Sequence, residues 1–580
     1  MLFFRRQYDH RFAYWYRQYT SQQDQKYFPD KVTPRSNIFV PYHFSDVETV
    51  VARTHDALFG YEPWFECSGR GANDVSVAEK MQQVLEYKLH RARLQHTFEA
   101  LIRNSAIYGI AAIKVDWDWD FDLVTQPVQI FAQVPYTDPQ TGITTLVNLP
   151  HPDTGQPMQV GVQMQTIPVP RNRPKFIPID IYDFLVDPDG GMSAHMVERT
   201  WEQMQREQQV YIQKFGKPLY FPEALQKIAS KLSGEPDAGS VIIRFAGFWN
   251  EFDNTCTQIT VDDKSAFSFK DLRGSYRSGS TFTAFKRKLL GGEPIILWHG
   301  QNPFAHQRAP ILYTSYTKLP HEPFGIGVIE STSDLVEATN SMVNMIRDNW
   351  NLGINRRYAY DIDRDIDHDA LNMANTPGGK VGVSGPPNEA IMELPTHTPA
   401  QGDYAILELF KGMIEMTSGI SDFYSKGIGS PTNNSTATGI SNIINESNLR
   451  FKLFIRNLEL DILQPLLEMC ASNVQQFMTD QEEIQITDEM AQIPKYINVQ
   501  PGELLGTVSF HLVAANYATN ETVRQRNLLA FANIAGQSPY VNEYPALLAL
   551  GKAFKIREIK QILKPPMQVQ QEHASTSTGT

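Results

Sequence analysis

The stretches STSDLVEATNSMVNMIRDNWNLGI, residues 331–354, and GDYAILELFKGMIEMTSGI, residues 402–420, decide how this chain folds. Each carries apolar side chains at the three- and four-residue spacing of a helix that buries one face. These residues are Leu335, Val336, Thr339, Met342, Val343, Ile346 and Trp350 in the first stretch, and Ile406, Leu409, Phe410, Met413 and Ile414 in the second. The pattern predicts two helices whose stripes face inward, the first with Ser333 or Asp334 as its N-cap.

The segment between these two helices has a different character. RRYAYDIDRD, residues 356–365, alternates like a strand, and NTPGGKVGVSGPPNEA, residues 375–390, is rich in glycine and proline. We therefore expect a small β-containing module inserted between two helices.

The second helix is followed by SKGIGSPTNNSTATG, residues 425–439, whose small and polar residues predict a flexible loop. Helical spacing resumes at Ile440 and continues to about Phe477, with Pro465 able to kink the helix. Further along, residues 507–515 predict a strand, residues 520–535 and 542–563 predict helices, and the polar end of the chain predicts disorder.

The first 330 residues mix helical and strand patterns. Helical spacing is found in residues 4–19, 44–59, 76–108 and 197–216, and the turn residues of 124–178 predict projecting hairpins. Residues 4–19 interleave aromatic residues with arginines, a mixture that can stack on nucleic acid. We interpret it instead as a helix that packs its aromatic stripe on protein. The fold class that follows is mixed α+β, with several domains.

Four aspartates lie in KVDWDWDFD, residues 114–122, where they alternate with apolar residues. The alternation predicts a strand with one buried face and one acidic face in water. Neighbours on one face of a strand are about 6.6–7 Å apart, so a divalent cation could bridge a pair. Asp116, Asp118 and Asp120 are weak candidates for such a site, and we expect no metal.

Composition limits the classes of function. The 580 residues are too many for one core, and 42% hydrophobic with 20% charged residues is typical of a globular protein. A net charge of −12 argues against a protein that grips DNA through phosphate contacts. The three cysteines are far apart, which predicts neither a disulfide framework nor a zinc site. No stretch reads as a membrane span.

Sequence motifs of catalysis are missing. The sequence contains no GxxxxGK[ST] phosphate loop, no GxSxG elbow and no HExxH. YDIDRDIDHD, residues 360–369, imitates the start of a calcium loop, but Ile366 stands where the loop needs glycine and Asn372 where it needs glutamate. We therefore expect neither an enzyme nor a cofactor.

The order of four segments along the chain is the basis for comparing it with a known family. They are SNIFVPYHFSDVETVVARTHDALFG (36–60), FIPIDIYDFLVDPDG (176–190), PFGIGVIESTSDLVEATNSMVNMIRDNW (323–350) and SDFYSKGIGSPTNNSTATGISNIINESNLRFKLFIRNLE (421–459). Together they resemble the portal proteins of tailed bacteriophages, short-tailed phages in particular. The resemblance implies a ring of about twelve copies at one capsid vertex, the channel through which double-stranded DNA is packaged and ejected.

The resemblance also implies a division of the chain. It makes residues 1–330 a wing with a hairpin insertion at about 124–178, 331–353 and 402–422 two stem helices, 354–401 a clip, 423–438 a tunnel loop, 439–515 a long wing helix with a returning wing strand, 516–566 a helical crown and 567–580 a disordered tail. The chain would reside in the virion, and in the host cytoplasm during assembly.

Partners follow from the same resemblance. They are further copies of the chain, double-stranded DNA, the large terminase, head–tail adaptor or tail proteins, and the major capsid and scaffolding proteins, with no membrane. In the tunnel loop, the residues expected to face DNA are Lys426, Asn433, Asn434, Ser435 and Thr436. In the clip, those expected to contact a neighbouring subunit, terminase or adaptor are Arg356, Arg357, Asp363, Arg364 and Asp365.

An acidic chain suits a channel in which duplex slides. Each phosphate ion pair releases counterions and adds affinity, so a sliding surface should form few of them. Two alternatives stay open. One is a metal-dependent nuclease or terminase-like enzyme that uses the aspartates of residues 116–122 or 361–369. The other is a different virion structural protein that does not encircle DNA.

Overall fold

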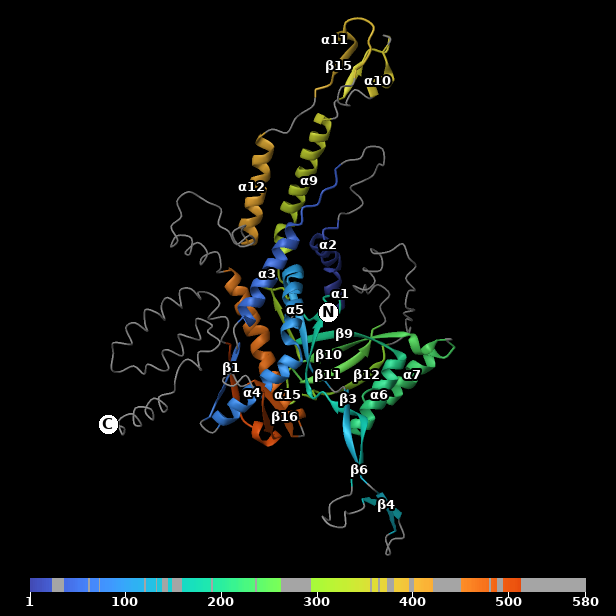
Figure 1. Cartoon of the computed structure of the whole chain (residues 1–580), viewed down its shortest axis with the longest axis vertical. Coiled ribbons are helices and arrows are strands. Elements are labelled where there is room, and N and C mark those ends of the chain that lie inside the picture. Colours follow the sequence, from blue (N-terminus) through green and yellow to red (C-terminus); the bar gives the residue numbers. More distant parts are fainter. Residues whose placement is uncertain are drawn as a thin grey trace, which may run out of the picture.

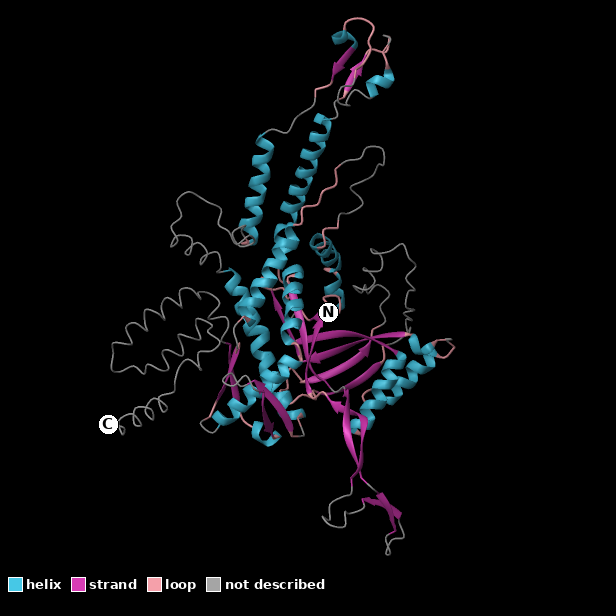
Figure 2. Ribbon diagram, in the orientation of Figure 1, coloured by secondary structure: helices cyan, strands magenta, loops and turns pink. Residues whose placement is uncertain are grey.

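The computed structural model describes residues 1–22, 36–60, 63–71, 74–118, 121–131, 133–137, 144–148, 159–188, 191–234, 237–261, 294–354, 357–363, 366–372, 380–395, 401–420, 450–478, 481–487 and 494–512. Helices and antiparallel sheets form a central body; a pair of helices rises from one end of it and a narrow hairpin leaves the other (Figures 1 and 2). The architecture is mixed α and β, as the sequence predicts.

The helices are α1 (Leu2–Arg6), α2 (Asp9–Tyr19), α3 (Tyr42–Phe59), α4 (Val75–Arg91), α5 (Leu94–Tyr108), α6 (Trp201–Phe215), α7 (Pro222–Leu232), α9 (Val328–Ile354), α10 (His368–Asn372), α11 (Pro387–Ala390), α12 (Gln401–Ser418) and α15 (Gln464–Phe477). Short helical turns are η3 (Ala238–Ser240), η4 (Glu459–Leu463) and η5 (Pro501–Leu504).

The strands are β1 (Phe65–Gly69), β2 (Ile110–Asp118), β3 (Phe121–Phe131), β4 (Gln133–Thr137), β5 (Thr144–Asn148), β6 (Gln159–Pro170), β7 (Arg173–Ile179), β8 (Phe184–Val186), β9 (Met192–Thr200), β10 (Ile242–Asn250), β11 (Thr255–Thr260), β12 (Ile296–Gln301), β13 (Ile311–Ser315), β14 (Tyr358–Tyr360), β15 (Ile391–Glu393), β16 (Glu482–Thr487), β17 (Pro494–Val499) and β18 (Val508–Leu512).

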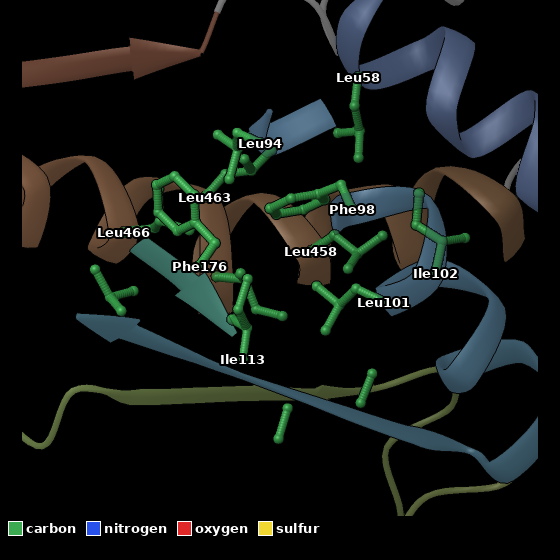
Figure 3. Close-up of a cluster of buried hydrophobic side chains, with 14 of the residues drawn as sticks. Leu58, Leu94, Phe98, Leu101, Ile102, Ile113, Phe176, Leu458, Leu463 and Leu466 are labelled. Carbon is green, nitrogen blue, oxygen red and sulfur yellow. The ribbon is translucent and has the colours of Figure 1, made fainter. Parts of the chain in front are cut away.

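The main hydrophobic core lies where α3, α4, α5 and α15 meet β2 and β7 (Figure 3). Phe98 and Leu101 of α5, Ile113 of β2, and Leu458 and Leu466 of the C-terminal helix are fully buried there. Each such side chain stabilises the fold by about 1.5–3 kcal/mol on burial. The core therefore ties together segments that are far apart in the sequence.

The single helix predicted over residues 76–108 is in fact two helices. α4 ends at Arg91 and α5 begins at Leu94. Arg93 between them has a φ of 54°, in the left-handed region, which ends one helix and redirects the chain. Helical spacing continues on both sides of this residue, so the apolar pattern alone does not reveal the break.

Two larger antiparallel sheets and two two-stranded sheets, β1-β18 and β16-β17, lie in the described part of the body. Among the described strands, one larger sheet has the order β12-β11-β10-β9-β8 and is covered by α6 and α7, and the other larger sheet has the order β13-β2-β7 (Figure 1). The helix predicted over 197–216 begins only at Trp201, because the preceding residues continue β9. Thr200 then caps α6: its side chain accepts from the Gln203 N–H over 3.2 Å.

A hairpin arm projects from the body. β3 pairs with β6, and β4 pairs with β5 further out (Figure 1). This confirms the hairpins predicted within 124–178, although the final part of that range, from Arg173, is strand β7 of the body.

The N-terminal helices pack on the body through their aromatic residues. Phe12 and Trp15 of α2 are buried, and the Phe12 ring lies 5.9 Å from that of Phe324. Arg5 is also buried, with its Nη1 3.1 Å from Asp9 Oδ1. The interpretation of residues 4–19 as a packing helix is therefore confirmed, with the difference that two helices, α1 and α2, share the segment.

The predicted helix at 331–353 is α9, which starts earlier, at Val328. Ser333 and Asp334 consequently lie inside the helix and do not cap it. The chain enters α9 through a close backbone contact: a Cβ on Gly325 would lie 2.3 Å from the Thr317 carbonyl oxygen, and one on Gly327 2.8 Å from that of Ala106. With 27 residues, α9 is about 40 Å long.

The long C-terminal helix accommodates Pro465 without a break. Residues 450–458 are α-helical, Glu459–Leu463 widen into a π-helical turn, and α15 follows from Gln464. Proline lacks the N–H that would bond to the carbonyl four residues earlier, and a wider turn removes that demand. β18, within the strand predicted over 507–515, then returns to the body and pairs with β1.

Candidate functional site

The helix pair α9 and α12 is the most prominent feature outside the body. The two helices run antiparallel side by side, and Trp350 Nε1 donates a hydrogen bond to the Tyr404 hydroxyl over 3.3 Å (Figure 1). Ile414 of α12 is buried, and α12 packs along α9. The existence and pairing of the two predicted helices are thereby confirmed.

A second face of α12 is apolar and open to solvent. Ile406, Leu409, Met413 and Met416 are 43%, 55%, 43% and 81% exposed, and their spacing of three, four and three residues aligns them along one side of the helix. We call these four residues the α12 stripe. The inward orientation predicted for Ile406, Leu409 and Met413 is wrong within one chain, because α9 covers only the adjoining face.

The burial of α9 side chains changes along the length of the helix. Its buried residues all lie between Val328 and Asn340, in the half that enters the body. Beyond that point Met345, Trp350 and Ile354 are 60%, 53% and 65% exposed. Trp350, predicted to lie on the buried stripe, is therefore half exposed. The outer halves of both helices present apolar side chains that the chain itself does not cover.

An extended segment, residues 36–40, is bound along α9, and we call it the strap. The N–H groups of Ser36, Ile38 and Val40 donate to Asp348 Oδ1, Asn344 Oδ1 and Asn340 Oδ1 over 2.7, 2.6 and 2.8 Å. Asn344 Nδ2 also donates to the Ile38 carbonyl over 2.9 Å. Two residues of extended chain and four residues of a helix both advance by about 6–7 Å. Every second residue of the strap therefore lies beside every fourth residue of α9. The sequence signal of this contact is a short polar side chain at every fourth residue of α9, which on its own is equally typical of a solvated helix face.

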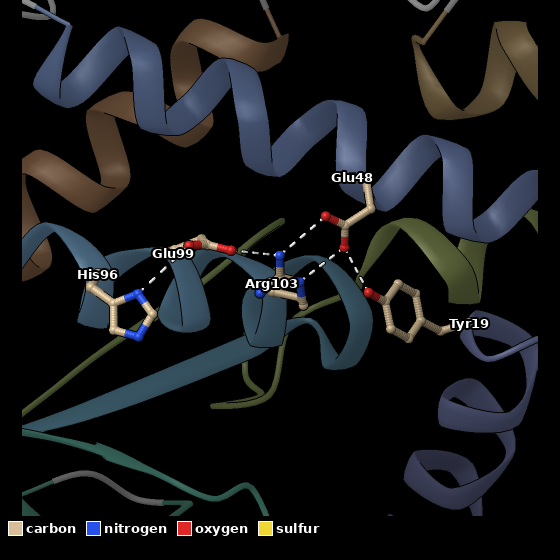
Figure 4. A network of polar contacts seen from close by, with 5 residues as sticks. All are labelled: Tyr19, Glu48, His96, Glu99 and Arg103. Atoms are coloured by element: carbon tan, nitrogen blue, oxygen red, sulfur yellow. Dashed lines mark hydrogen bonds and ion pairs between the residues drawn. The ribbon is translucent and has the colours of Figure 1, made fainter.

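The N-terminal helices also attach to α9 and to each other through polar groups. The Tyr14 hydroxyl donates to Glu337 Oε1 over 2.6 Å. In Figure 4, Arg103 of α5 donates to both carboxylate oxygens of Glu48 on α3, over 2.9 and 3.1 Å, and Glu48 also accepts from the Tyr19 hydroxyl. The hydrogen bonds from Arg103 lower the pKa of Glu48, while burial and the bond to Glu48 raise the pKa of Tyr19 to about 12. These contacts fix the base of α9 in the body.

Both flanks of residues 421–449 meet at the base of α12. Arg450 Nη1 donates to the carbonyl of Thr417 over 3.3 Å and lies 3.5 Å from that of Met416. Cations favour the carbonyl end of a helix, so Arg450 caps α12. The intervening segment therefore leaves and returns at one place. The predicted DNA-facing residues Lys426, Asn433, Asn434, Ser435 and Thr436 belong to it and lie outside the described residues.

The outer end of the α9–α12 pair carries a small module, which we call the tip: described residues 357–363, 366–372 and 380–395. Strands β14 and β15 pair there, and Ile366 bridges to Val383 (Figure 1). Of the predicted contact residues, Arg357 and Asp363 are exposed on the tip. Arg356, Arg364 and Asp365 lie outside the described residues.

Asp116, Asp118 and Asp122 are each held by basic side chains. Asp118 is buried, with its Oδ2 3.3 Å from Arg173 Nε and 3.6 Å from Arg171 Nη1, and Arg171 Nε also donates to Asp122 over 2.6 Å. Asp116 accepts from Lys114 Nζ over 2.7 Å. Burial acts to raise the pKa of Asp116, but Lys114 lowers it below its usual value.

The expectation of an acidic face in water is therefore wrong for Asp118. Asp120 lies outside the described residues. Where the structure is described, no three histidine, cysteine, aspartate or glutamate side chains come together as a metal site. A helix that could cross a membrane is likewise missing from the described part of the chain.

Comparison with known proteins adds one finding. Residues 289–561 match the family described as Phage SU10 portal protein, and SU10 is a short-tailed phage. The match begins just before β12, includes α9, the tip, α12 and α15, and ends beyond the described residues. No curated protein matches the sequence.

Proposed function

Since residues 289–561 match a phage portal family, we propose that this chain is a portal protein, that its copies close into a ring at one vertex of the capsid and that double-stranded DNA passes through the centre. The portal family is structural and non-enzymatic. The family match thus favours a structural role over the nuclease alternative.

The observation that carries the ring is the uncovered apolar surface of α9 and α12. Met416 is 81% and Leu409 is 55% exposed, on a helix that already buries another face against α9. Soluble proteins expose such continuous apolar stripes chiefly where another protein covers them. In a ring, each subunit uses one side of the helix pair to cover its neighbour, which gives a head-to-tail contact that closes by rotation.

The remaining assignments follow from this arrangement. α9 and α12 are the stem, the tip is the clip, the body up to residue 330 is the wing, residues 423–438 are the tunnel loop and residues 516–566 are the crown. Arg450 supports the tunnel loop assignment, because it draws both flanks of residues 421–449 to the base of the stem. Lys426, Asn433, Asn434, Ser435 and Thr436 would contact duplex at the narrowest point, mostly through uncharged groups that allow sliding.

The clip is the docking end for the large terminase during packaging and afterwards for head–tail adaptor or tail proteins. Arg356, Arg357, Asp363, Arg364 and Asp365 would form contacts there with neighbouring subunits or with these partners. The wing would contact the major capsid and scaffolding proteins, which places the chain at the capsid vertex of the virion and in the host cytoplasm during assembly.

Electron microscopy of the purified full-length chain tests the proposal. Negatively stained particles should be closed rings with a central hole, about twelvefold in symmetry by class averaging. Native mass spectrometry of the same sample measures the number of copies. Monomers or open fibres under conditions where the chain is folded would refute the ring and favour a virion protein that does not encircle DNA.

A further inference from the structure

The α12 stripe faces away from α9. Tyr404 marks the side of α12 that meets α9, because its hydroxyl accepts a hydrogen bond from Trp350 Nε1. At about 100° per residue, Ile406 and Leu409 lie about 160° and 140° around the helix from Tyr404. α9 of the same chain therefore cannot cover the stripe, and any molecule that covers it has to approach α12 from the side turned away from α9.

The strap lies on the side of α9 that is turned away from α12 (Figure 1). Asp348, which accepts from the Ser36 N–H, is about 160° around α9 from Trp350. Met345 lies about 60° from Asp348 and about 140° from Trp350, and it is 60% exposed. Met345 and the strap therefore belong to one edge of the helix pair, which we call the α9 edge, and the α12 stripe belongs to the other edge.

The α9 edge and the α12 stripe lie at the same level along the helix pair. The two helices run antiparallel, so levels can be counted residue by residue from the bond between Trp350 and Tyr404. Met345 is then level with Leu409, and the strap-binding residues of α9 are level with residues 406–414. Rotation about an axis that runs along the helices keeps these levels. In a ring, the stripe of one copy would therefore meet the α9 edge of the next.

The chemistry of the α9 edge suits an apolar partner. The strap residues Ile38, Phe39 and Val40 are apolar and half-buried in the single chain. The carboxylate of Asp348 already accepts a backbone N–H of the strap, so its charge is partly satisfied within the subunit. Two apolar surfaces at one level favour contact with a second copy of the chain over contact with DNA or a charged protein.

We propose that the α12 stripe of one copy packs on the α9 edge of the next, and that the strap must be bound to α9 before the next copy can join. The proposal rests on the proposed function, in which copies stand side by side in a ring. Two unlike edges give a head-to-tail contact that repeats around a ring, whereas two stripes that met each other would end at a dimer. The strap is required because α9 has no buried residue beyond Asn340, so hydrogen bonds to the strap hold the surface that receives the neighbour.

Cysteine cross-linking tests which surfaces meet. Met345→Cys and Leu409→Cys are made in the full-length chain, singly and together, and rings verified by electron microscopy are treated with a short bismaleimide. The double variant should give a ladder of covalent oligomers on denaturing gels, because each contact then holds one cysteine of each kind, and a mixture of the two single variants should stop at dimers. Each single variant alone measures the reaction of the native cysteines, of which Cys67 is half-buried and the other two are buried. Met345→Cys mixed with Leu505→Cys is the matched control and should not cross-link, because Leu505 is 65% exposed but lies outside the helix pair.

Hydrogen exchange and strap variants test the second part of the proposal. Amides of residues 36–40 should exchange about 10-fold more slowly in the ring than in the unassembled Leu409→Asp variant. Asn344→Leu, which removes two hydrogen bonds to the strap, should raise the protein concentration needed for half-assembly about 5- to 100-fold. Asp348→Ala removes a different hydrogen bond to the strap and should act in the same direction. Asn351→Leu, at an exposed site on the same helix, should assemble like the unmodified chain.

Rings that give no ladder with the double variant, or that give the same ladder with Leu409→Cys alone, would overturn the pairing of the stripe with the α9 edge. Normal assembly of both strap variants, or unchanged exchange of residues 36–40 on assembly, would overturn the requirement for the strap. Failure of the unmodified chain to form rings is a separate outcome and counts against the proposed function, because no contact between copies is then present to be cross-linked.

Discussion

A carboxylate placed on the α12 stripe should prevent assembly while leaving the subunit folded. Leu409 is 55% exposed in the single chain, so Leu409→Asp removes little of the subunit's own packing. In the ring, however, the same side chain is expected to lie in the contact between neighbours. The substitution therefore separates folding from assembly.

The exposed fractions of the α12 stripe set the magnitude. Together they amount to about two fully exposed side chains, so covering them contributes about 3–6 kcal/mol to each contact between subunits. Leu409 accounts for about a quarter of this, and an unpaired carboxylate in its place costs several kcal/mol more. A loss of about 4 kcal/mol per contact weakens each contact about a thousandfold.

Size-exclusion chromatography with light scattering measures the outcome. Leu409→Asp should elute as monomers or small oligomers, with a melting temperature within a few degrees of that of the unmodified subunit. Gln401→Asp is the control, since Gln401 is an exposed residue of the same helix outside the stripe, and it should form rings. Full ring assembly of folded Leu409→Asp at ordinary protein concentration would show that the stripe does not join subunits.

Three further predictions concern how the subunit holds α9. Asn344→Leu removes both hydrogen bonds to Ile38 and should destabilise the strap by about 1–3 kcal/mol, seen as faster amide exchange in residues 36–40, whereas Asn351→Leu, at an exposed site on the same helix, should have no such effect. Gly109→Ala should lower the free energy of unfolding by about 3 kcal/mol or more, measured by denaturant titration, because Gly109 has a φ of 79° and a Cβ there would lie 2.1 Å from the Gly325 carbonyl oxygen. Burial lowers the pKa of His43 to about 4, below its unfolded value of about 6.5. The stability that this histidine contributes above pH 6.5 should therefore be lost as the pH falls toward 4. Melting curves of His43→Asn should show a smaller loss of stability over the same pH range.

The spacing of apolar residues predicted the helices and strands whose formation depends on residues close together in the sequence. The helices α9 and α12 and the buried side of β2 follow from apolar spacing, because a residue's position on a helix or strand depends only on its distance along the chain. Val115 and Trp117 are accordingly buried. The same reasoning could not say what would cover an apolar stripe, which is why Leu409 was expected to face inward.

Contacts that depend on distant segments could not be predicted in this way. Asp118 reads as a solvated acid until Arg171 and Arg173 are brought back to it by the pairing of β2 with β7. Asn340 and Asn344 likewise read as the polar side of a helix, yet they bind the backbone of residues 38–40. In both cases the partner lies far away in sequence, and its identity is set by topology.

The way α9 is held explains why one helix can serve both the body and the tip. Its first half is anchored by the core, by the close contacts of Gly325 and Gly327 and by Tyr14, so it cannot turn without disturbing the body. Its second half has no buried residue of its own and relies on the strap, on α12 and, in the proposed ring, on the neighbouring subunit. A helix anchored at one end and supported laterally at the other transmits displacement along its axis. We therefore expect a load on the tip to be carried into the body through α9, and we expect the contact between subunits in the proposed ring to limit how far the outer half bends.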